Sequence, residues 1–315
     1  MRWGRRSCRP AQCFALTRSL DRSRRSGNNC CCDLLDRLAR HPPRRSSPHR
    51  FSVDLGPDAL PGPNLTAAIS PDGRRLVFAA RGPNGKQRRA TRLLDQAQAT
   101  LLPGTENGSD PFFSPDGQWV GFSAGTELKK ISVQGGAPVT ISLAPSNPFS
   151  GVGSIMLGAS WGKDGNIIAA FGIGFPLSRI PAGGAPQPLA KLGPGEITHR
   201  WPQVLPGDDV ILFTASSSLP QENANIEAIS LKTGQVKVLQ HGGYSGRYLP
   251  GGYLVYVRQG VLFGVPFDPG PLEVRGVPTP LVEDVAANPL SGGGQFDFSS
   301  TGTLVYAAGK GAAQK

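Results

Sequence analysis

The stretch Ser70-Pro71-Asp72-Gly73, followed by Leu76-Val77-Phe78-Ala79-Ala80, is the clearest structural signal in the chain. It returns as Ser114-Pro115-Asp116-Gly117 before Trp119-Val120-Gly121-Phe122-Ser123. In such a turn, proline fixes φ, aspartate hydrogen-bonds the neighbouring backbone, and glycine adopts the positive φ that lets the chain reverse. Each copy therefore predicts a β-hairpin.

Four weaker copies of this unit follow, so that the turn glycines stand at positions 73, 117, 165, 207, 251 and 302. Their spacings are 44, 48, 42, 44 and 51 residues, and further strand pairs with their own turns lie between them. Four short strands per unit at this period are typical of a propeller blade. The sequence therefore predicts an all-β fold, a six-bladed β-propeller of four-stranded antiparallel blades over residues 51–315. The residues interpreted as structural turn formers are Asp72, Gly73, Asp116, Gly117, Asp164 and Gly165.

The last repeat is shorter than the others, because only residues 295–298 and 303–308 have the pattern of strands before the chain ends. It predicts half a blade. Residues 51–55 alternate between apolar and polar side chains, so we expect them to pair with residues 303–308 and close the ring, which would remove exposed strand edges. The alternative is a gene product truncated at both ends.

Composition supports an all-β chain. The 42 Gly and 30 Pro among 315 residues disfavour a helical bundle, and 38% hydrophobic residues are too many for a chain disordered throughout. No stretch approaches the roughly 18 uninterrupted apolar residues of a membrane-spanning helix.

The first fifty residues differ from the rest. Residues 1–50 contain 13 Arg, 3 Asp and all five Cys, so the net charge of +11 lies almost wholly there and residues 51–315 carry about +1. The segment lacks the apolar region of a secretory signal. We interpret residues 1–50 as a disordered basic extension, or as the product of a start codon placed too far upstream. The three cysteines at 30–32 have no second cluster at zinc-type spacing, and we expect no metal.

At the residues quoted above the chain resembles the TolB-type six-bladed propellers with WD-like repeats, over nearly all of residues 51–315. It also resembles the propellers that follow a kinase domain and a membrane span in some bacterial serine/threonine protein kinases. That resemblance rests on Thr198-His199-Arg200-Trp201-Pro202-Gln203 and on Leu102-Pro103-Gly104-Thr105-Glu106. The chain departs from the pattern at residues 88–91, 161–165 and 207–209. The resemblance implies a sensor module outside the cytoplasm, although no signal peptide is found and the chain as written would be cytoplasmic.

Three catalytic patterns are not supported by the sequence. Gly158-Ala159-Ser160-Trp161-Gly162 matches a nucleophile elbow, but no helix follows it, and Ser160 aligns with the serines of the repeat turns. The Gly-rich loop, strand Lys and catalytic Asp of a kinase are absent. Ser291-Gly292-Gly293-Gly294 precedes a strand instead of a helix N-terminus, so we expect a loop there and no phosphate site.

A functional site of a propeller is expected at the channel mouth, where loops enter the innermost strands. The candidate ligand-binding residues there are Asp110, His199, Arg200, Arg247 and Gln295. One carboxylate, one imidazole and two guanidinium groups would suit an anionic or peptide-like ligand. The alternative is structural: His199 as a satisfied core histidine, and Arg200 bonded to backbone carbonyls.

Two hypotheses follow. The first is a non-catalytic recognition or sensor module that binds a protein or peptide, or else a small ligand, and that belongs with a kinase absent from this chain. The second is a propeller enzyme of the lactonase or lyase type with its site at the channel mouth, which would need a metal held by several carboxylates or histidines. We expect a monomer with no cofactor and no specific nucleic-acid partner.

Overall fold

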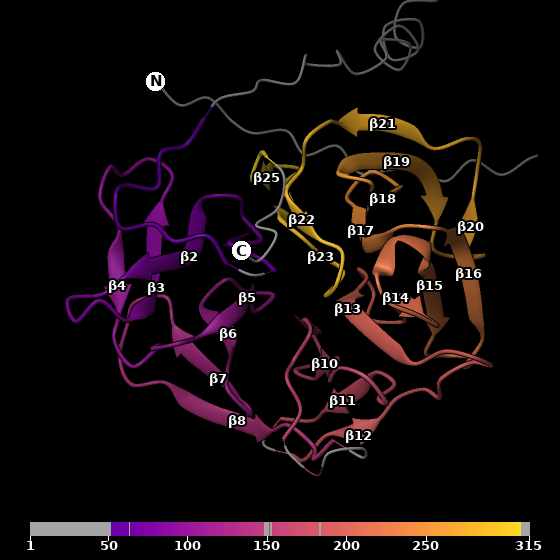
Figure 1. The fold of residues 1–315 in the computed structure, drawn as a ribbon, viewed down its shortest axis with the longest axis horizontal. Helices are drawn as coiled ribbons and strands as arrows, with labels where there is room; N and C mark the ends of the chain where they lie inside the picture. The colour runs from indigo at the N-terminus through magenta and orange to yellow at the C-terminus, as the bar shows by residue number, and fades with distance from the viewer. Residues whose placement is uncertain (1–51, 63, 148–150, 152, 183, 310–315) are drawn as a thin grey trace, which may run out of the picture. The chain divides into compact units, whose positions relative to one another are not determined.

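The computed structural model describes residues 52–62, 64–147, 151, 153–182 and 184–309. The chain divides into two units, Met1–Val53 and Asp54–Lys315. Almost all of the first unit, including the predicted basic extension and its cysteines, lies outside the described residues. The second unit is a ring of small antiparallel sheets (Figure 1).

Five sheets of this unit have the four-stranded antiparallel order of a propeller blade, with the innermost strand first. Blade 1 contains β1 (Ala67–Ile69), β2 (Arg75–Arg81), β3 (Gln87–Leu93) and β4 (Thr100–Leu102). Blade 2 contains β5 (Ser109–Phe113), β6 (Trp119–Ala124), β7 (Glu127–Ser132) and β8 (Val139–Leu143). Blade 3 contains β9 (Ala159–Trp161), β10 (Ile167–Ala169), β11 (Ser178–Ile180) and β12 (Gln187–Pro188).

Blade 4 contains β13 (Thr198–Val204), β14 (Val210–Ser216), β15 (Asn225–Ser230) and β16 (Val236–His241), with the short 3-10 helix η1 (Gln221–Asn223) before β15. Blade 5 contains β17 (Tyr244–Leu249), β18 (Tyr253–Arg258), β19 (Val261–Asp268) and β20 (Glu273–Val274), and β21 (Thr279–Val282) also pairs with β19. Two two-stranded sheets complete the unit. They are β22 (Ala287–Asn288) with β23 (Gly293–Gly294), and β24 (Phe296–Phe298) with β25 (Leu304–Tyr306).

The expectation of six blades is therefore wrong: the structure has five. All six repeat turns do join two antiparallel strands, but the last hairpin, β24–β25, has no outer strands. Blade 5 takes both β20 and β21, and the residues after β21 form the small β22–β23 sheet. A count of turns therefore exceeds the count of blades by one.

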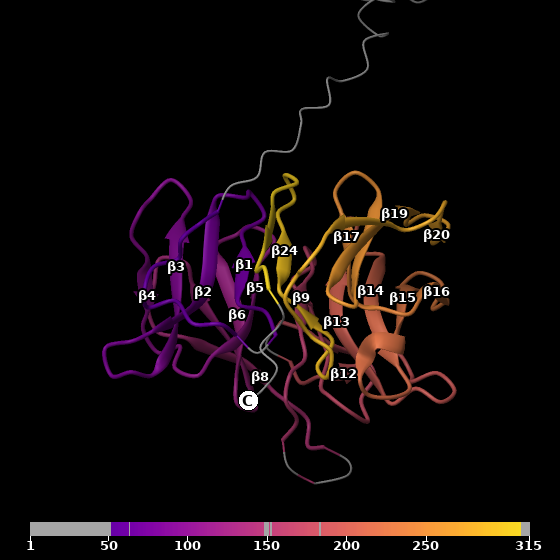
Figure 2. The ribbon, with the colours of Figure 1, turned by 45° about the horizontal axis from the view of Figure 1, so that its top comes forward.

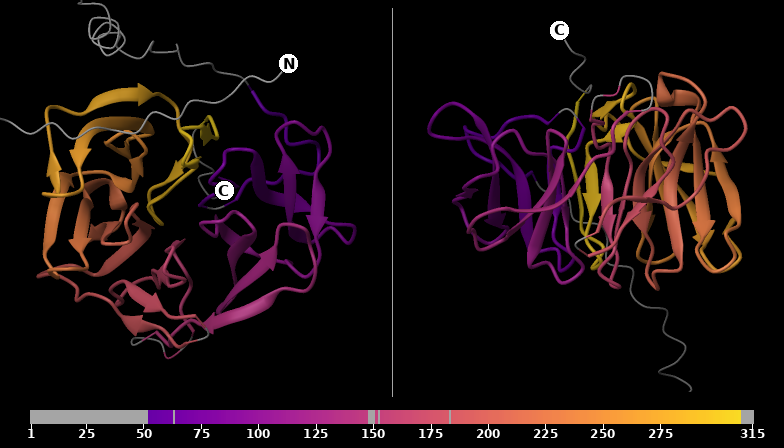
Figure 3. Two further views of the ribbon diagram at one scale, coloured as in Figure 1. Left: turned by 180° about the vertical axis from the view of Figure 1, so that it is seen from behind. Right: turned by 90° about the horizontal axis from the view of Figure 1, so that it is seen from below.

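The ring closes through the hairpin β24–β25, which lies between blade 5 and blade 1 (yellow in Figures 2 and 3). Ile69 of β1 donates its backbone N–H to Asp297 Oδ2 at 2.9 Å, and the Ser300 backbone N–H donates to Pro71 O at 2.9 Å. Of the predicted closing strand, residue 51 lies outside the described residues, and residues 52–55 carry no strand. Instead of a paired strand, the hairpin offers side chains that accept hydrogen bonds from the backbone N–H groups at the exposed edge of β1. The expectation that residues 51–55 pair there was therefore wrong.

The first two repeat turns share one hydrogen-bond pattern. Ser70 Oγ and Ser114 Oγ each donate to the aspartate two residues later, and each accepts a backbone N–H five residues later, from Arg75 and from Trp119. The core consists of apolar layers between neighbouring blades. Each blade packs against the next, as Val77 and Leu102 of blade 1 do against Val120 and Phe122 of blade 2. Sheets that can bury their faces only against each other hold the innermost strands around a common axis.

Within the described residues no helix is long and apolar enough to cross a bilayer.

Candidate functional site

Three innermost strands each carry a β-bulge. The pairing register shifts within β5, β13 and β17, and each shift contains a residue with left-handed backbone: Asp110 (φ 48°), Trp201 (φ 52°) and Ser245 (φ 55°). Just before β9, Gly158 (φ 94°) has the same handedness. A bulge bends the strand that carries it and re-aims its side chains, at some cost in backbone energy for residues other than glycine. These four residues therefore define a waist in the channel.

The Trp201 side chain fills that waist. It is 2% exposed, and its indole Nε1 donates to the Ser291 carbonyl at 2.8 Å. A Cβ built on Gly158 would lie 2.6 Å from Trp201 Cε3, and one on Gly293 would lie 2.9 Å from Cζ2. Glycines on two sides thus make room for the indole ring.

Trp201 separates two cavities that share no lining residue. The loop-end cavity, of about 990 Å³, lies where loops enter the innermost strands. The turn-end cavity, of about 390 Å³, is lined by residues of all six repeat turns. The boundary falls between Leu157 and Gly158, just before β9, and between Arg200 and Trp201 on β13. The axis of the ring therefore holds two distinct cavities, with Trp201 at the boundary between them.

The loop-end cavity combines apolar walls with a few polar groups. Its lining residues are Asn147, Ser154, Ile155, Leu157, Phe171, Gly172, Ile173, Arg200, Glu222, Tyr244, Gln259, Gly260, Asp284, Val285, Ala287, Asn288, Pro289, Leu290, Ser291 and Gly309. Three large apolar side chains of this set are exposed: Ile155 (64%), Leu290 (59%) and Ile173 (39%). A concavity with an apolar rim and few polar groups is the usual form of a binding site.

Arg200 is the buried cation of the loop-end cavity. Its side chain donates from Nη1 to Leu290 O at 2.8 Å and from Nε to Thr198 Oγ1 at 3.3 Å, and the residue is 3% exposed. Burial lowers the pKa of Arg200 to about 10, so the guanidinium stays charged at neutral pH. No carboxylate of the described residues forms an ion pair with it.

Ser154 also lines this cavity and is 4% exposed. Its Oγ has no hydrogen-bond partner among the described residues. A buried hydroxyl without a partner is rare in native proteins and costs free energy. Such a group at a cavity wall is suited to a ligand.

The predicted site residues do not come together. Arg200 lines the loop-end cavity, Asp110 and Arg247 line the turn-end cavity, and His199 and Gln295 line neither. Gln295 instead joins the last hairpin to the residues before β1. Its Oε1 accepts the Thr66 backbone N–H at 2.6 Å, and its Nε2 donates to Gly62 O at 2.9 Å.

Asp110 is deeply buried in the turn-end cavity. Asn64 Nδ2 donates to both carboxyl oxygens, at 3.2 and 3.3 Å. Burial raises the pKa of Asp110 to about 6, against the lowering effects of Asn64 and of the Arg89 guanidinium.

Arg247 donates from Nη1 to Trp201 O at 2.9 Å and to Gly246 O at 3.0 Å. Burial lowers its pKa, and the nearby Asp297 carboxylate opposes that shift. The pKa of Asp297 is in turn raised by burial. Asp110, Arg247 and Asp297 are thus already engaged by the protein on the inner side of the turn-end cavity.

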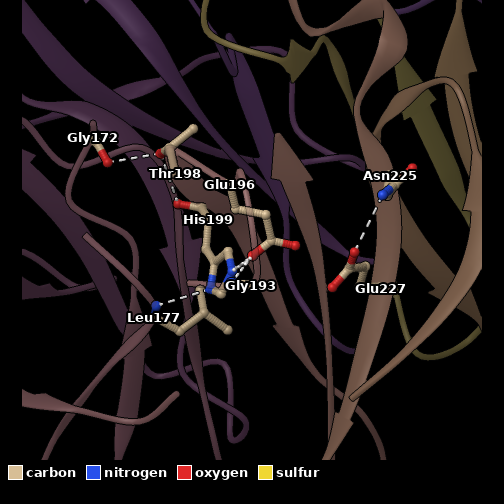
Figure 4. A network of polar contacts seen from close by, with 8 residues as sticks. All are labelled: Gly172, Leu177, Gly193, Glu196, Thr198, His199, Asn225 and Glu227. Carbon is tan, nitrogen blue, oxygen red and sulfur yellow. Dashed lines mark hydrogen bonds and ion pairs between the residues drawn. The ribbon is translucent and has the colours of Figure 1, made fainter. Parts of the chain in front are cut away.

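His199 belongs to a buried cluster between blades 3 and 4 (Figure 4). Its Nδ1 accepts the Leu177 backbone N–H at 3.4 Å, which leaves the proton on Nε2 to be donated to Glu196 Oε2 at 2.8 Å. The Glu196 and Glu227 carboxyl groups interact as well. Burial, then the Glu196 carboxylate, raise the pKa of Glu227, whereas the His199 hydrogen bond lowers the pKa of Glu196. His199, Glu196 and Glu227 thus form an interacting acid–base cluster that lines neither cavity.

Sequence reasoning missed Ser154, Glu196, Glu227 and the partition by Trp201. A lone serine in a loop carries no pattern. The Trp-Pro pair at 201–202 belongs to a segment that the sequence does single out, but nothing in that segment indicates a left-handed backbone.

No family model and no curated protein matches this chain. Many solved structures do, and the three that follow have low sequence identity to it. A putative TolB from Agrobacterium tumefaciens is 17% identical, with a TM-score of 0.55, over 78% of this chain and 91% of that one. TolB from Acinetobacter baumannii is 18% identical, with a TM-score of 0.53, over 74% of this chain and 56% of that one. An oligogalacturonate lyase in complex with manganese is 15% identical, with a TM-score of 0.52, over 78% of this chain and 71% of that one.

At these identities the likeness shows the fold alone. The described part of the protein is an all-β propeller of five antiparallel blades, and its fold is similar to that of the two TolB structures.

Proposed function

We propose that this propeller is a non-catalytic recognition module that binds a protein or peptide partner at the loop-end cavity. The observation that carries the proposal is the exposed apolar rim of Ile155, Ile173 and Leu290 around a cavity of about 990 Å³. Exposed apolar side chains gathered around a concavity are typical of interaction sites. A sensor role beside a kinase is supported by the resemblance of residues 102–106 and 198–203 to segments of kinase-associated propellers.

The enzyme alternative has no specific observation in its favour. A propeller lyase does share the fold. In the part of the chain that the structure describes, however, no three His, Cys, Asp or Glu side chains gather where they could hold a metal ion. The acid–base cluster of His199, Glu196 and Glu227 lines neither cavity.

Site-specific photo-crosslinking tests the proposal. A benzophenone amino acid at Leu290, which is 59% exposed at the rim, is compared with one at Leu143, which is 61% exposed on the outer strand β8. In extracts of the cells that make the protein, the Leu290 variant is expected to give one discrete adduct and the Leu143 variant none. Equal labelling at both positions, or no adduct at Leu290, would overturn the assignment of the partner to this end of the channel.

A further inference from the structure

We propose that the loop-end cavity captures the C-terminal carboxylate of a partner peptide, with Arg200 and Ser154 as its anchoring groups. The proposal rests on the recognition function above and specifies its ligand chemistry.

The shape of the cavity favours a chain end over an internal segment. Trp201 and the Ser291 carbonyl that its indole binds close the inner end, and no residue lines both cavities. An internal segment would have to enter and leave through one mouth. A chain terminus needs to enter only once.

The buried positive charge of Arg200 favours the C-terminus of a peptide, which carries a carboxylate. Arg200 is a buried guanidinium that donates to a carbonyl and a hydroxyl, both neutral. A buried charge without a counter-charge is unfavourable, and a carboxylate is the planar anion that best matches a guanidinium. An incoming carboxylate would therefore gain a charge-assisted hydrogen bond where the free protein has no ion pair.

Ser154 offers a second donor in the lining of the same cavity. A short path of contacts joins it to Arg200: Arg200 Nε bonds Thr198 Oγ1, and Thr198 Oγ1 donates to Gly172 O at 2.7 Å. A Cβ on Gly172 would lie 3.8 Å from the carbonyl of Ile155, the residue after Ser154. Because the unpartnered Ser154 hydroxyl and the Arg200 guanidinium line one cavity, Ser154 is the second donor that the proposal assigns to the anion.

The rest of the lining suits the body of a peptide. Leu157, Phe171 and Val285 offer buried apolar surface to a terminal side chain. Glu222 and Asp284 line the same cavity. They disfavour an anion close to them, so the carboxylate is expected beside Arg200, and they can accept hydrogen bonds from peptide N–H groups or from a basic side chain further from the terminus.

Paired peptide pools test the inference. One pool of synthetic decapeptides has its last four positions randomised and a free C-terminal carboxylate, and the other is the same pool with a C-terminal amide. Each is selected on the immobilised full chain, and affinities of enriched sequences are measured by fluorescence anisotropy. We expect the free acids to bind at least ~10-fold more tightly than their amides, as a lost hydrogen bond to a charged group implies.

Variants test whether Arg200 and Ser154 cause the preference for free acids over amides. Arg200→Gln and Ser154→Ala are each expected to weaken acid binding and to reduce the acid-to-amide ratio. Ser154→Ala removes a hydroxyl without a protein partner, so its melting temperature should match or exceed that of the wild type even if Arg200→Gln folds poorly. Ser142→Ala, a buried serine on β8 outside the cavity, is the matched control and should keep the full ratio.

Three results would overturn the inference: amides that bind as tightly as acids, a ratio unchanged in Ser154→Ala and Arg200→Gln, or no enrichment from the acid pool. A discrete crosslink at Leu290 together with any of these would leave the recognition function standing and remove only the carboxylate anchor. Absence of both the crosslink and the enrichment would remove both.

Discussion

The partition of the channel by Trp201 can be tested at the glycine beside it. Gly158 has φ 94°, and a Cβ there would lie 2.6 Å from Trp201 Cε3 and 2.9 Å from Trp201 Cα. Gly165, in the third repeat turn, has a similar φ of 83°, but a Cβ there would meet nothing within 4 Å. The two glycines therefore share the backbone requirement and differ in the space available.

The magnitudes follow from that difference. Alanine at either position takes on a left-handed backbone, which costs about 1–2 kcal/mol. At Gly158 the added methyl group also overlaps the backbone and ring of Trp201, and overpacking of this kind costs about 1–3 kcal/mol more. We expect Gly165→Ala to lower the free energy of unfolding by about 1–2 kcal/mol and Gly158→Ala by about 2–5 kcal/mol.

Denaturant titration of both variants measures the free energies of unfolding. The same pair is then made in a Trp201→Ala background, where the indole ring is gone. The excess cost of Gly158→Ala should shrink there, because residues in contact are energetically coupled. If Gly158→Ala costs no more than Gly165→Ala, or if its excess is unchanged without the indole, the indole is not packed tightly enough against Gly158 to separate the two cavities.

Further predictions concern buried polar groups. The folded-state pKa of Asp110 is raised from 3.8 to about 6, so the folded state keeps a proton that the unfolded state loses. The free energy of unfolding should therefore fall by about 3 kcal/mol as the pH rises from 3.8 to about 6. Asp110→Asn should remove this slope from unfolding free energies measured between pH 3.5 and 7.5. The pKa of Glu227 is raised as well, so the wild type should also lose stability from this group as the pH rises above about 4.5. Glu227→Gln has no such proton to lose, so its unfolding free energy relative to that of the wild type should be higher at pH 8 than at pH 5 in the same assay. Gln295→Ala leaves two backbone groups at the ring closure without partners and should lower the unfolding free energy by about 2 kcal/mol or more. Gln240→Ala, on β16, removes only a solvent-exposed side-chain hydrogen bond and should change the unfolding free energy by less than about 0.5 kcal/mol.

The hairpins were predictable because their information is local. A turn such as Ser70-Pro71-Asp72-Gly73 specifies its own geometry through proline, a side-chain acceptor and a glycine, and the alternating residues after it specify a strand. The number of blades depends instead on which distant strands pair. Nothing near residues 270–294 indicates that β20 and β21 would both join β19 and leave the last hairpin without outer strands. Pairing over such distances is decided by packing, not by the local sequence.

The candidate site was harder to predict for a related reason. Position relative to the repeat turn identified residues near the axis, but not the direction of each side chain. His199, Arg200 and Trp201 are consecutive, yet they do three different things. His199 packs against Phe213, with ring centroids 4.6 Å apart, Arg200 lines the loop-end cavity, and Trp201 closes it. Alternation along a strand separates the first two, and the bulge redirects the third.

The same bulge explains why one channel can present two unlike surfaces. Without a left-handed residue at Trp201 the strand would continue its alternation, and nothing would place an indole across the axis. With it, the residue before the bulge faces one cavity and the bulge residue faces the other. The cation of the loop-end cavity, Arg200, is thereby kept apart from the carboxyl groups of Asp110 and Asp297 on the turn side, which would otherwise compete with a ligand for it. Within its own cavity Arg200 donates to a carbonyl and a hydroxyl and forms no ion pair with the lining carboxylates Glu222 and Asp284, so this guanidinium is available to an anion from outside.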